Sequence, residues 1–388
     1  MAAMTNVAGI YDLVGDIAEV VEIEGRLVIR FESVPDRFSP KLRPTGDGSF
    51  IVETGSFAGA EISFGESGGV IGGIIPIERI DRPDPPPWPT GKGLILSELE
   101  LTEEESAAYQ QLWTQIQHRS DGEWIAWDLP WPRHRFVEWL TRGRHVIFHG
   151  SPHGDLDLFV PRRGSIELFD HGGRGNRAAV YGTPYGLWSM WFAVIDRSKL
   201  DGSIRNGVLN FSSGDEVLDV YNFSVHHEFL GTDVWRTGTL YLLPPETFEP
   251  IPFYPGGPNS NEWASTIELR PIARLEIRPE DFPFLDRVGG HDDSELIASD
   301  QLGDIVTEHI DAAHRIAGGM ALHLRWDDEV AQIIETYLES RRRFTPDVSR
   351  QHRIEPTGEH WLDVEGPDGF IQTYQHMLVS RGIEIQEH

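Results

Sequence analysis

Short apolar runs alternate with polar turns over the first part of the chain. Residues 20–24 and 27–31 are two such runs, separated by a Gly-Arg turn, and residues 50–52 follow a Gly-Asp-Gly turn. Runs of this length, bounded by glycine and rich in β-branched and aromatic residues, are typical of antiparallel strands joined by tight turns. The pattern predicts a small antiparallel β-sheet or barrel over residues 1–81.

A run of prolines marks the next boundary. Residues 82–89 read RPDPPPWP, and consecutive prolines fix φ, lack N–H donors and hold the chain extended. Behind them, Thr102 and three glutamates resemble a capped helix start, with Tyr109 and Trp113 at helical spacing. We expect a proline-rich linker and one helix over residues 82–128.

Residues 129–290 mix turns and strand-like runs with two helical stretches, near 132–140 and 185–195. Strands and helices combined in one region favour an α+β domain. The sequence therefore predicts a second, larger domain of α+β class in this part of the chain.

The pattern changes again beyond residue 290. Residues 300–317 and 327–342 have the amphipathic period of helices, and residues 370–381 precede Gly382, a typical helix end. We expect a mostly helical C-terminal tail over residues 291–388.

Charge limits the choice of partners. The 388 residues include 62 acidic and 33 basic side chains, a formal net charge of −29, and so acidic a surface repels phosphate backbones and anionic lipid headgroups. No run approaches the roughly 20 apolar residues that cross a bilayer, and residues 1–10 lack the pattern of a signal peptide. Nucleic acid and membrane are disfavoured as partners, and the expected location is the cytoplasm.

The chain has no cysteine, which excludes disulfides and cysteine-ligated zinc. His226, His227 and Glu228, together with His149 and His153, suggest a metal-dependent hydrolase as one alternative. Adjacent histidines on a strand point to opposite faces, however, and no HExxH-type spacing is present. We therefore predict no metal site.

The first segment with candidate chemistry is residues 144–151, RHVIFHGS. An apolar strand runs into a turn formed by His149, Gly150 and Ser151. Glycine lets a ligand approach the backbone, and a neutral histidine offers a donor or an acceptor at the strand end.

Two further strand ends carry an aromatic ring and a carboxylate. Residues 178–184, AAVYGTP, place Tyr181 ahead of a helix rich in tryptophan and phenylalanine, where a ring can stack on a planar ligand. Glu262 precedes a later strand, and an acid there can stabilise positive charge that develops on a sugar.

The order of these motifs resembles the ADP-ribosyltransferase superfamily, in its poly(ADP-ribose) polymerase-like branch with the His-Tyr-Glu signature. HGS at 149–151 is similar to the first family motif, VYGTP at 180–184 to the second, and NEW at 261–263 to the NEY that opens the third. The resemblance implies a catalytic domain with a split sheet, and NAD as a substrate.

The resemblance also implies roles in binding NAD. His149 would hydrogen-bond a ribose hydroxyl, and the Gly150 backbone would hold the nicotinamide carboxamide, with Ser151 beside it. Tyr181 would stack on the nicotinamide ring, and Phe192 stands where the family often has a second tyrosine.

By the same resemblance, Glu262 would hydrogen-bond the 2′-hydroxyl of the nicotinamide ribose and support an oxocarbenium-like transition state. Ser260 lies where arginine- or guanine-modifying relatives carry Glu or Gln, which disfavours an arginine acceptor. The implied reaction passes ADP-ribose to a protein, a small molecule or water. The alternative is a non-catalytic module that binds NAD, ADP-ribose or a protein; the oligomeric state is open.

The first domain resembles the small β-domain appended to some serine β-lactamase-like hydrolases. Gly9-Ile10-Tyr11 and the EGRL of residues 24–27 carry this similarity. No catalytic set is visible in the segment, so we expect an accessory or binding module.

Overall fold

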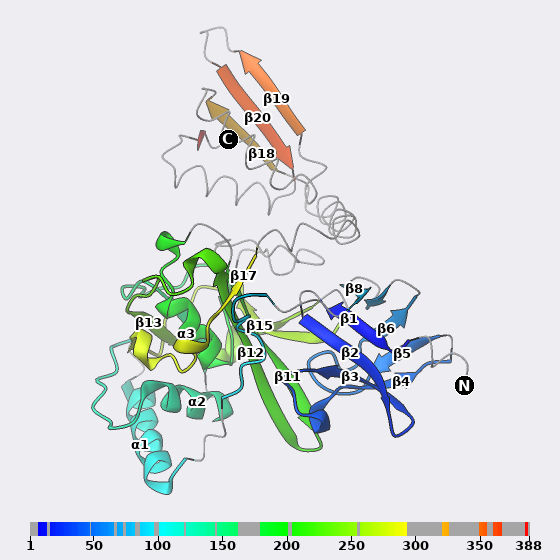
Figure 1. Cartoon of the computed structure of the whole chain (residues 1–388). Coiled ribbons are helices and arrows are strands. Elements are labelled where there is room, and N and C mark those ends of the chain that lie inside the picture. The colour runs from blue at the N-terminus through cyan, green and yellow to red at the C-terminus, as the bar shows by residue number, and fades with distance from the viewer. Residues whose placement is uncertain are drawn as a thin grey trace. The chain divides into compact units, whose positions relative to one another are not determined.

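The described residues are mostly β-structure (Figure 1). They form a closed barrel, three three-stranded sheets, one four-stranded sheet and three α-helices. The computed structural model describes residues 7–13, 16–46, 48–65, 68–72, 75–81, 86–96, 101–119, 122–143, 146–161, 179–200, 204–253, 257–292, 320–325, 349–354, 360–366 and 385–386.

The first eight strands form the closed antiparallel barrel, in which β1 also pairs with β8. They are β1 (Gly9–Leu13), β2 (Asp16–Ile23), β3 (Arg26–Phe31), β4 (Lys41–Pro44), β5 (Ser49–Val52), β6 (Glu61–Phe64), β7 (Gly68–Ile71) and β8 (Ile75–Ile80). Tyr11, Val20 and Leu27 are almost fully buried. Glu24 and Gly25 have φ values of 51° and 78°, as a two-residue type I′ hairpin between β2 and β3 requires.

Three sheets make up the central region. The first has the order β16-β13-β9, the second β10-β15-β14 and the third β11-β12-β17. The strands are β9 (Ile147–Ser151), β10 (Val180–Gly182), β11 (Ile204–Ser213), β12 (Glu216–His226), β13 (Gly238–Leu243), β14 (Glu249–Pro252), β15 (Asn259–Ser265), β16 (Ala273–Ile277) and β17 (Gly289–His291).

The three described helices belong to this region. They are α1 (Glu103–Arg119), α2 (Arg133–Gly143) and α3 (Gly186–Val194). Helix α3 reads GLWSMWFAV, and Leu187, Met190 and Trp191 in it are fully buried. These side chains belong to the main hydrophobic core, and burial of each stabilises the fold by roughly 1.5–3 kcal/mol. No helix in the described ranges is long and apolar enough to cross a membrane.

The barrel packs against the hairpin of β11 and β12. The rings of Phe31 and Phe211 meet edge-on at 5.4 Å. Val34 and Phe38 are buried in the same cluster as Phe211 and Val220. The barrel and the hairpin thus share a small hydrophobic core.

A buried ion pair joins α1 to α2. The Arg135 guanidinium donates to both Glu105 oxygens, at 2.5 and 2.7 Å, and the Tyr109 hydroxyl donates to the same carboxylate at 2.8 Å. The Glu105 side chain is only 1% exposed. The pKa of Glu105 is held below its ordinary value, mainly by its hydrogen bonds with Arg135.

The expectation of a central α+β domain built on a split sheet is wrong. The described residues are predominantly strands in a barrel and several small sheets, with three helices. The long hairpin of β11 and β12, which turns at Gly214 with a φ of 63°, accounts for part of the difference. Residues 212–216, SSGDE, do mark this turn, but the motifs that carry the resemblance lie outside the two strands that flank it, so the resemblance does not predict their pairing.

The tail also differs from the expectation. Its strands β18 (Met320–Arg325), β19 (Ser349–Ile354), β20 (His360–Gly366) and β21 (Ile385–Gln386) form one antiparallel sheet, in the order β19-β20-β18-β21. Residues 360–366 read HWLDVEG, an alternation typical of a strand. The helices expected at 300–317, 327–342 and 370–381 lie outside the described residues.

The chain divides into two compact units. The first consists of Met1–Pro161, Ala179–Pro252 and Gly257–Asp293, and the second contains Ser294–His388 with two shorter segments. The barrel and the central sheets therefore belong to one unit, and the sheet of the tail belongs to the other.

Replacing Arg135 with Met should lower the free energy of unfolding by about 3–5 kcal/mol, because it leaves the buried Glu105 carboxylate without its cation. Lys199→Met is the control, because the Lys199–Asp233 pair is 42% and 88% exposed and should cost less than about 1 kcal/mol. Urea unfolding followed by tryptophan fluorescence measures both. Equal losses for the two variants would contradict a structural role for the buried pair.

Candidate functional site

Strand β9 places His149 at the edge of its sheet. The strand pairs with β13, where Tyr241 lies opposite His149. On its other side, Phe148 and Thr183 exchange two backbone hydrogen bonds of 2.8 and 3.0 Å. This pair joins β9 to the segment that follows β10, so the first two central sheets are continuous here.

The His149 ring is held in one tautomer. Its Nδ1 lies 2.8 Å from the carbonyl oxygen of Tyr181, and because a carbonyl only accepts, Nδ1 carries the proton. Nε2 is therefore left as an acceptor. Burial lowers the pKa of His149 below its ordinary value, although the bond to the Tyr181 carbonyl opposes this. The ring is thus neutral at neutral pH, and Phe159 packs edge-on against it at 5.1 Å.

Gly150 and Ser151 are the last two residues of β9, so the turn expected at residues 149–151 begins only after Ser151. A Cβ on Gly150 would lie 1.8 Å from the carbonyl oxygen of Ser189, so only glycine lets α3 approach β9 this closely. The buried Ser151 hydroxyl accepts from the backbone N–H of His153 at 3.1 Å. The Ser151 side chain therefore stabilises the turn itself.

Tyr181 and Glu262 lie on one face of the second sheet. Tyr181 is directly opposite Ala264 in the antiparallel pair of β10 and β15, and Glu262 is two residues before Ala264. Because side chains alternate along a strand, all three share a face. The half-buried Tyr181 packs against a small cluster that contains Ala264 and Ile251.

The residues around Glu262 hold its strand in place. The Glu262 N–H donates to the Ser260 hydroxyl at 3.2 Å, and the Thr183 hydroxyl donates to the Asn261 carbonyl at 2.7 Å. The Ser260 hydroxyl is thus hydrogen-bonded within its own strand. Thr183 joins the turn after β10 to the residue immediately before Glu262.

The structure therefore carries His149, Tyr181 and Glu262 on the neighbouring strands β9, β10 and β15. His149 touches the backbone of Tyr181, and its ring packs with Phe159 and Tyr241. Phe192 lies on α3, where it packs against the main hydrophobic core.

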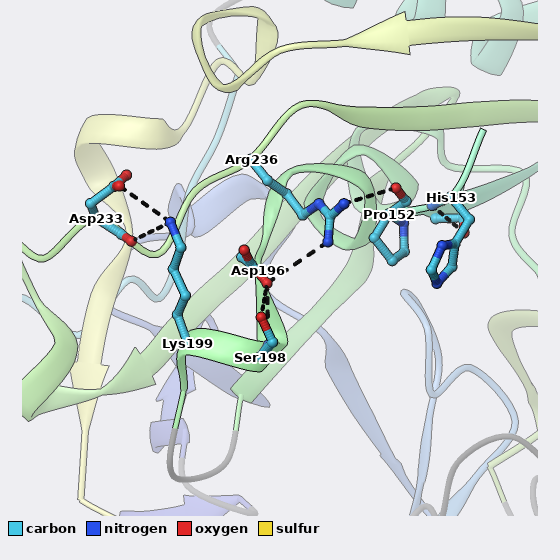
Figure 2. A network of polar contacts seen from close by, with 8 residues as sticks. Pro152, His153, Asp196, Ser198, Lys199, Asp233 and Arg236 are labelled. Atoms are coloured by element: carbon cyan, nitrogen blue, oxygen red, sulfur yellow. Dashed lines mark hydrogen bonds and ion pairs between the residues drawn. The ribbon is translucent and has the colours of Figure 1, made fainter. Parts of the chain in front are cut away.

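A polar network that the sequence did not indicate follows the turn after β9 (Figure 2). The Arg236 guanidinium donates to the Pro152 carbonyl at 3.2 Å and lies 3.8 Å from the Asp196 carboxylate. The Ser198 hydroxyl donates to that carboxylate at 2.6 Å, and this bond is the first cause of the lowered pKa of Asp196. Arg236 thus connects the turn after β9 to the segment after α3, and its guanidinium places a positive charge next to that turn.

Strand alternation predicted that the adjacent histidines at the end of β12 point to opposite faces. In the structure their rings lie side by side instead. β12 ends at His226, and a 3-10 turn, η3 (His227–Phe229), begins directly after it. The two rings stack at 4.6 Å, and Trp88 stacks on His227 at 4.1 Å. In the described part of the chain, no three His, Asp or Glu side chains are arranged to hold a metal ion.

A buried acid lies between α2 and the hairpin of β11 and β12. The Glu138 side chain is 9% exposed and accepts from Arg142 at 3.2 Å. Burial, followed by the negative charge of Asp219, raises the pKa of Glu138 to about 7, against the opposing effect of Arg142. The buried Tyr221 phenol has a raised pKa, chiefly through burial and then through Asp219 and Glu138. The sequence does not indicate this group, because the burial of an acidic side chain cannot be inferred from residue type alone.

Comparison of the chain with models of protein families, with curated proteins and with solved structures gave no match.

Glu138→Gln should make the protein more stable at neutral pH. Above the ordinary pKa of 4.5, Glu138 is ionised in the unfolded chain, whereas the folded chain keeps its proton up to about pH 7. Wild-type stability therefore falls as the pH rises through this window, by about 1.4 kcal/mol per pH unit. The stability of the variant relative to wild type should rise by roughly 2 kcal/mol between about pH 5.5 and 7.5.

Urea unfolding across this pH range measures the difference. Glu104→Gln, at an exposed position on α1, is the control and should show no such trend. A constant difference between Glu138→Gln and wild type would contradict the raised pKa.

Proposed function

We propose that this chain binds NAD and cleaves the glycosidic bond between its ribose and nicotinamide, passing ADP-ribose to a protein, a small molecule or water. The observation that supports this most is the placement of His149, Tyr181 and Glu262 on adjacent strands, in motifs that resemble one family's signature. The proposal rests on these side chains and not on a split-sheet fold. We place the activity in the cytoplasm.

Each residue would contribute through a group described above. The neutral His149 ring would accept a hydrogen bond from a ribose hydroxyl at Nε2, because its Nδ1–H already donates to the Tyr181 carbonyl. The backbone of Gly150, with Ser151 beside it, would hold the carboxamide, and Tyr181 would stack on the nicotinamide ring. These contacts would orient the glycosidic carbon toward Glu262.

The chemistry needs stabilisation of positive charge more than proton transfer. Nicotinamide in NAD is cationic, so breaking the C–N bond sends the electron pair to the ring nitrogen and releases a neutral molecule. The positive charge that remains is shared by the ribose ring oxygen and its anomeric carbon. Glu262 would accept a hydrogen bond from the 2′-hydroxyl and stabilise this charge. The protein, small molecule or water that receives ADP-ribose would then form a bond to the anomeric carbon and lose a proton.

A second candidate function is binding without turnover. Phe192, where the family often has a second tyrosine, packs against the hydrophobic core. A site with one fewer tyrosine at the ring favours recognition of NAD or ADP-ribose by a non-catalytic module. The same experiment separates the two functions.

Glu262→Gln should reduce nicotinamide release from NAD by about 100- to 1000-fold, because one preorganised charge at a transition state is worth this much. The dissociation constant for NAD should change by less than about threefold, since the amide keeps the size of the side chain. Nicotinamide is quantified by chromatography, and binding by calorimetry.

Glu104→Gln is the matched control. Glu104 is exposed on α1, which contributes no residue to the candidate site, so its loss should leave release unchanged. Wild-type protein that binds NAD and releases no nicotinamide would establish the binding module. Absence of both binding and release would refute the proposal.

A further inference from the structure

Asn210 is one of the residues through which the N-terminal barrel contacts the central sheets. The backbone N–H of Ser56, in the loop between β5 and β6, donates to the Asn210 carbonyl at 2.8 Å. The Asn210 N–H in turn donates to the Ser56 hydroxyl at 2.7 Å. Both backbone groups of Asn210 are therefore bonded to one serine of the barrel.

The loop that carries Ser56 is built for close approach. Gly55 has a φ of 85°, in the left-handed region, and a Cβ there would lie 2.9 Å from the Asn210 carbonyl oxygen. The Gly55 N–H also donates to the Ser212 hydroxyl at 3.3 Å. With the Phe31–Phe211 ring contact nearby, these bonds fix the barrel on β11.

The side chain of Asn210 continues toward the candidate site. Its oxygen accepts from the side-chain amide of Asn261 at 2.8 Å, and its own amide donates to Asp219 at 2.6 Å. These two partners determine the orientation of the amide, because a flip would set two donors against each other at Asn261. The Asn261 amide also donates to the Val208 carbonyl at 2.8 Å.

Asn261 directly precedes Glu262 in β15, so the bonds on Asn261 hold the backbone of this strand next to Glu262. Its side chain is bonded to β11, and its carbonyl accepts from Thr183 on the other side. The position of the Glu262 carboxylate depends on this backbone. Hydrogen bonds therefore connect Ser56 to Asn210 and Asn210 to Asn261, and Asn261 is the residue covalently before Glu262.

We propose that the N-terminal barrel positions Glu262 through this path, and that Asn210 and Ser56 are positioning residues for the reaction. This inference rests on the proposed function. The barrel would then support the site structurally, in addition to any role in binding a ligand of its own. Displacement of a catalytic group by about 1 Å can cost up to 100-fold in rate, so a small shift of β15 is sufficient to be measured.

Asn210→Ala should lower kcat for nicotinamide release by about tenfold or more, with KM within about twofold, because it moves Glu262 and leaves the residues that bind NAD in place. Ser56→Ala should lower kcat in the same direction, and Ser56→Thr, which keeps the hydroxyl, should restore it. The control is Arg37→Ala. Arg37 joins the same barrel to Glu216 of the same hairpin, through a pair that is 60% and 67% exposed, and its loss should leave kcat unchanged.

Hydrogen exchange of the full chain gives a readout that does not require activity. In Asn210→Ala and in Ser56→Ala, amides of residues 259–263 should exchange at least about tenfold faster, while those of β9 keep the wild-type rate. Unchanged exchange at 259–263, or equal losses of kcat in Arg37→Ala and Asn210→Ala, would overturn the positioning role. If wild type released no nicotinamide, the proposed function would fail, and the exchange rates would still decide whether the barrel holds β15.

Discussion

Close packing of α3 on β9 and β13 is the constraint on which the central region depends. Gly150 on β9 and Gly238 on β13 both face α3, and a Cβ at either position would lie within 2.0 Å of a carbonyl oxygen of the helix. With Trp191 buried against Phe223 at 5.2 Å, α3 connects these strands to the hairpin of β11 and β12. The helix brings elements that are far apart in the sequence into one core.

The candidate site forms at the edge of this core through polar contacts. The hydrogen bond from His149 to the Tyr181 carbonyl joins β9 to β10, and the bond from Thr183 to the Asn261 carbonyl joins the next turn to β15. Each bond is modest, at about 0.5–1.5 kcal/mol. Because an unpaired buried polar group is costly, their main effect is to select one arrangement of three strands. The sequence motifs would then act together although each of them is short.

Part of this arrangement can be read from the sequence. Helical periodicity places α2 and α3 within a few residues of their observed bounds, and Thr102 caps α1 by accepting from the Glu105 N–H at 3.1 Å. These features depend on local spacing and local hydrogen bonds. The strand that carries His149 is equally local, because it begins as an apolar run, although it continues through Gly150 to Ser151 where the sequence suggested a turn.

The remainder depends on contacts between distant residues. Asn210 gains its importance from Ser56 and Asn261, which are far from it in sequence. Family resemblance suggested a split sheet because it matches short motifs, and these do not determine how the strands between them pair. The stacked His226 and His227 rings show the same limit, since strand alternation fails at the residue where the strand ends.

The central claim is that His149 and Tyr181 belong to one NAD site. Equilibrium titration with an NAD analogue whose ribose oxygen is replaced by carbon measures binding without cleavage. The account predicts saturable binding to wild type, a dissociation constant raised by about tenfold in both His149→Ala and Tyr181→Ala, and no change in His118→Ala, which alters an exposed residue of α1. Equal affinity in all four proteins, or no saturable binding to wild type, would contradict it.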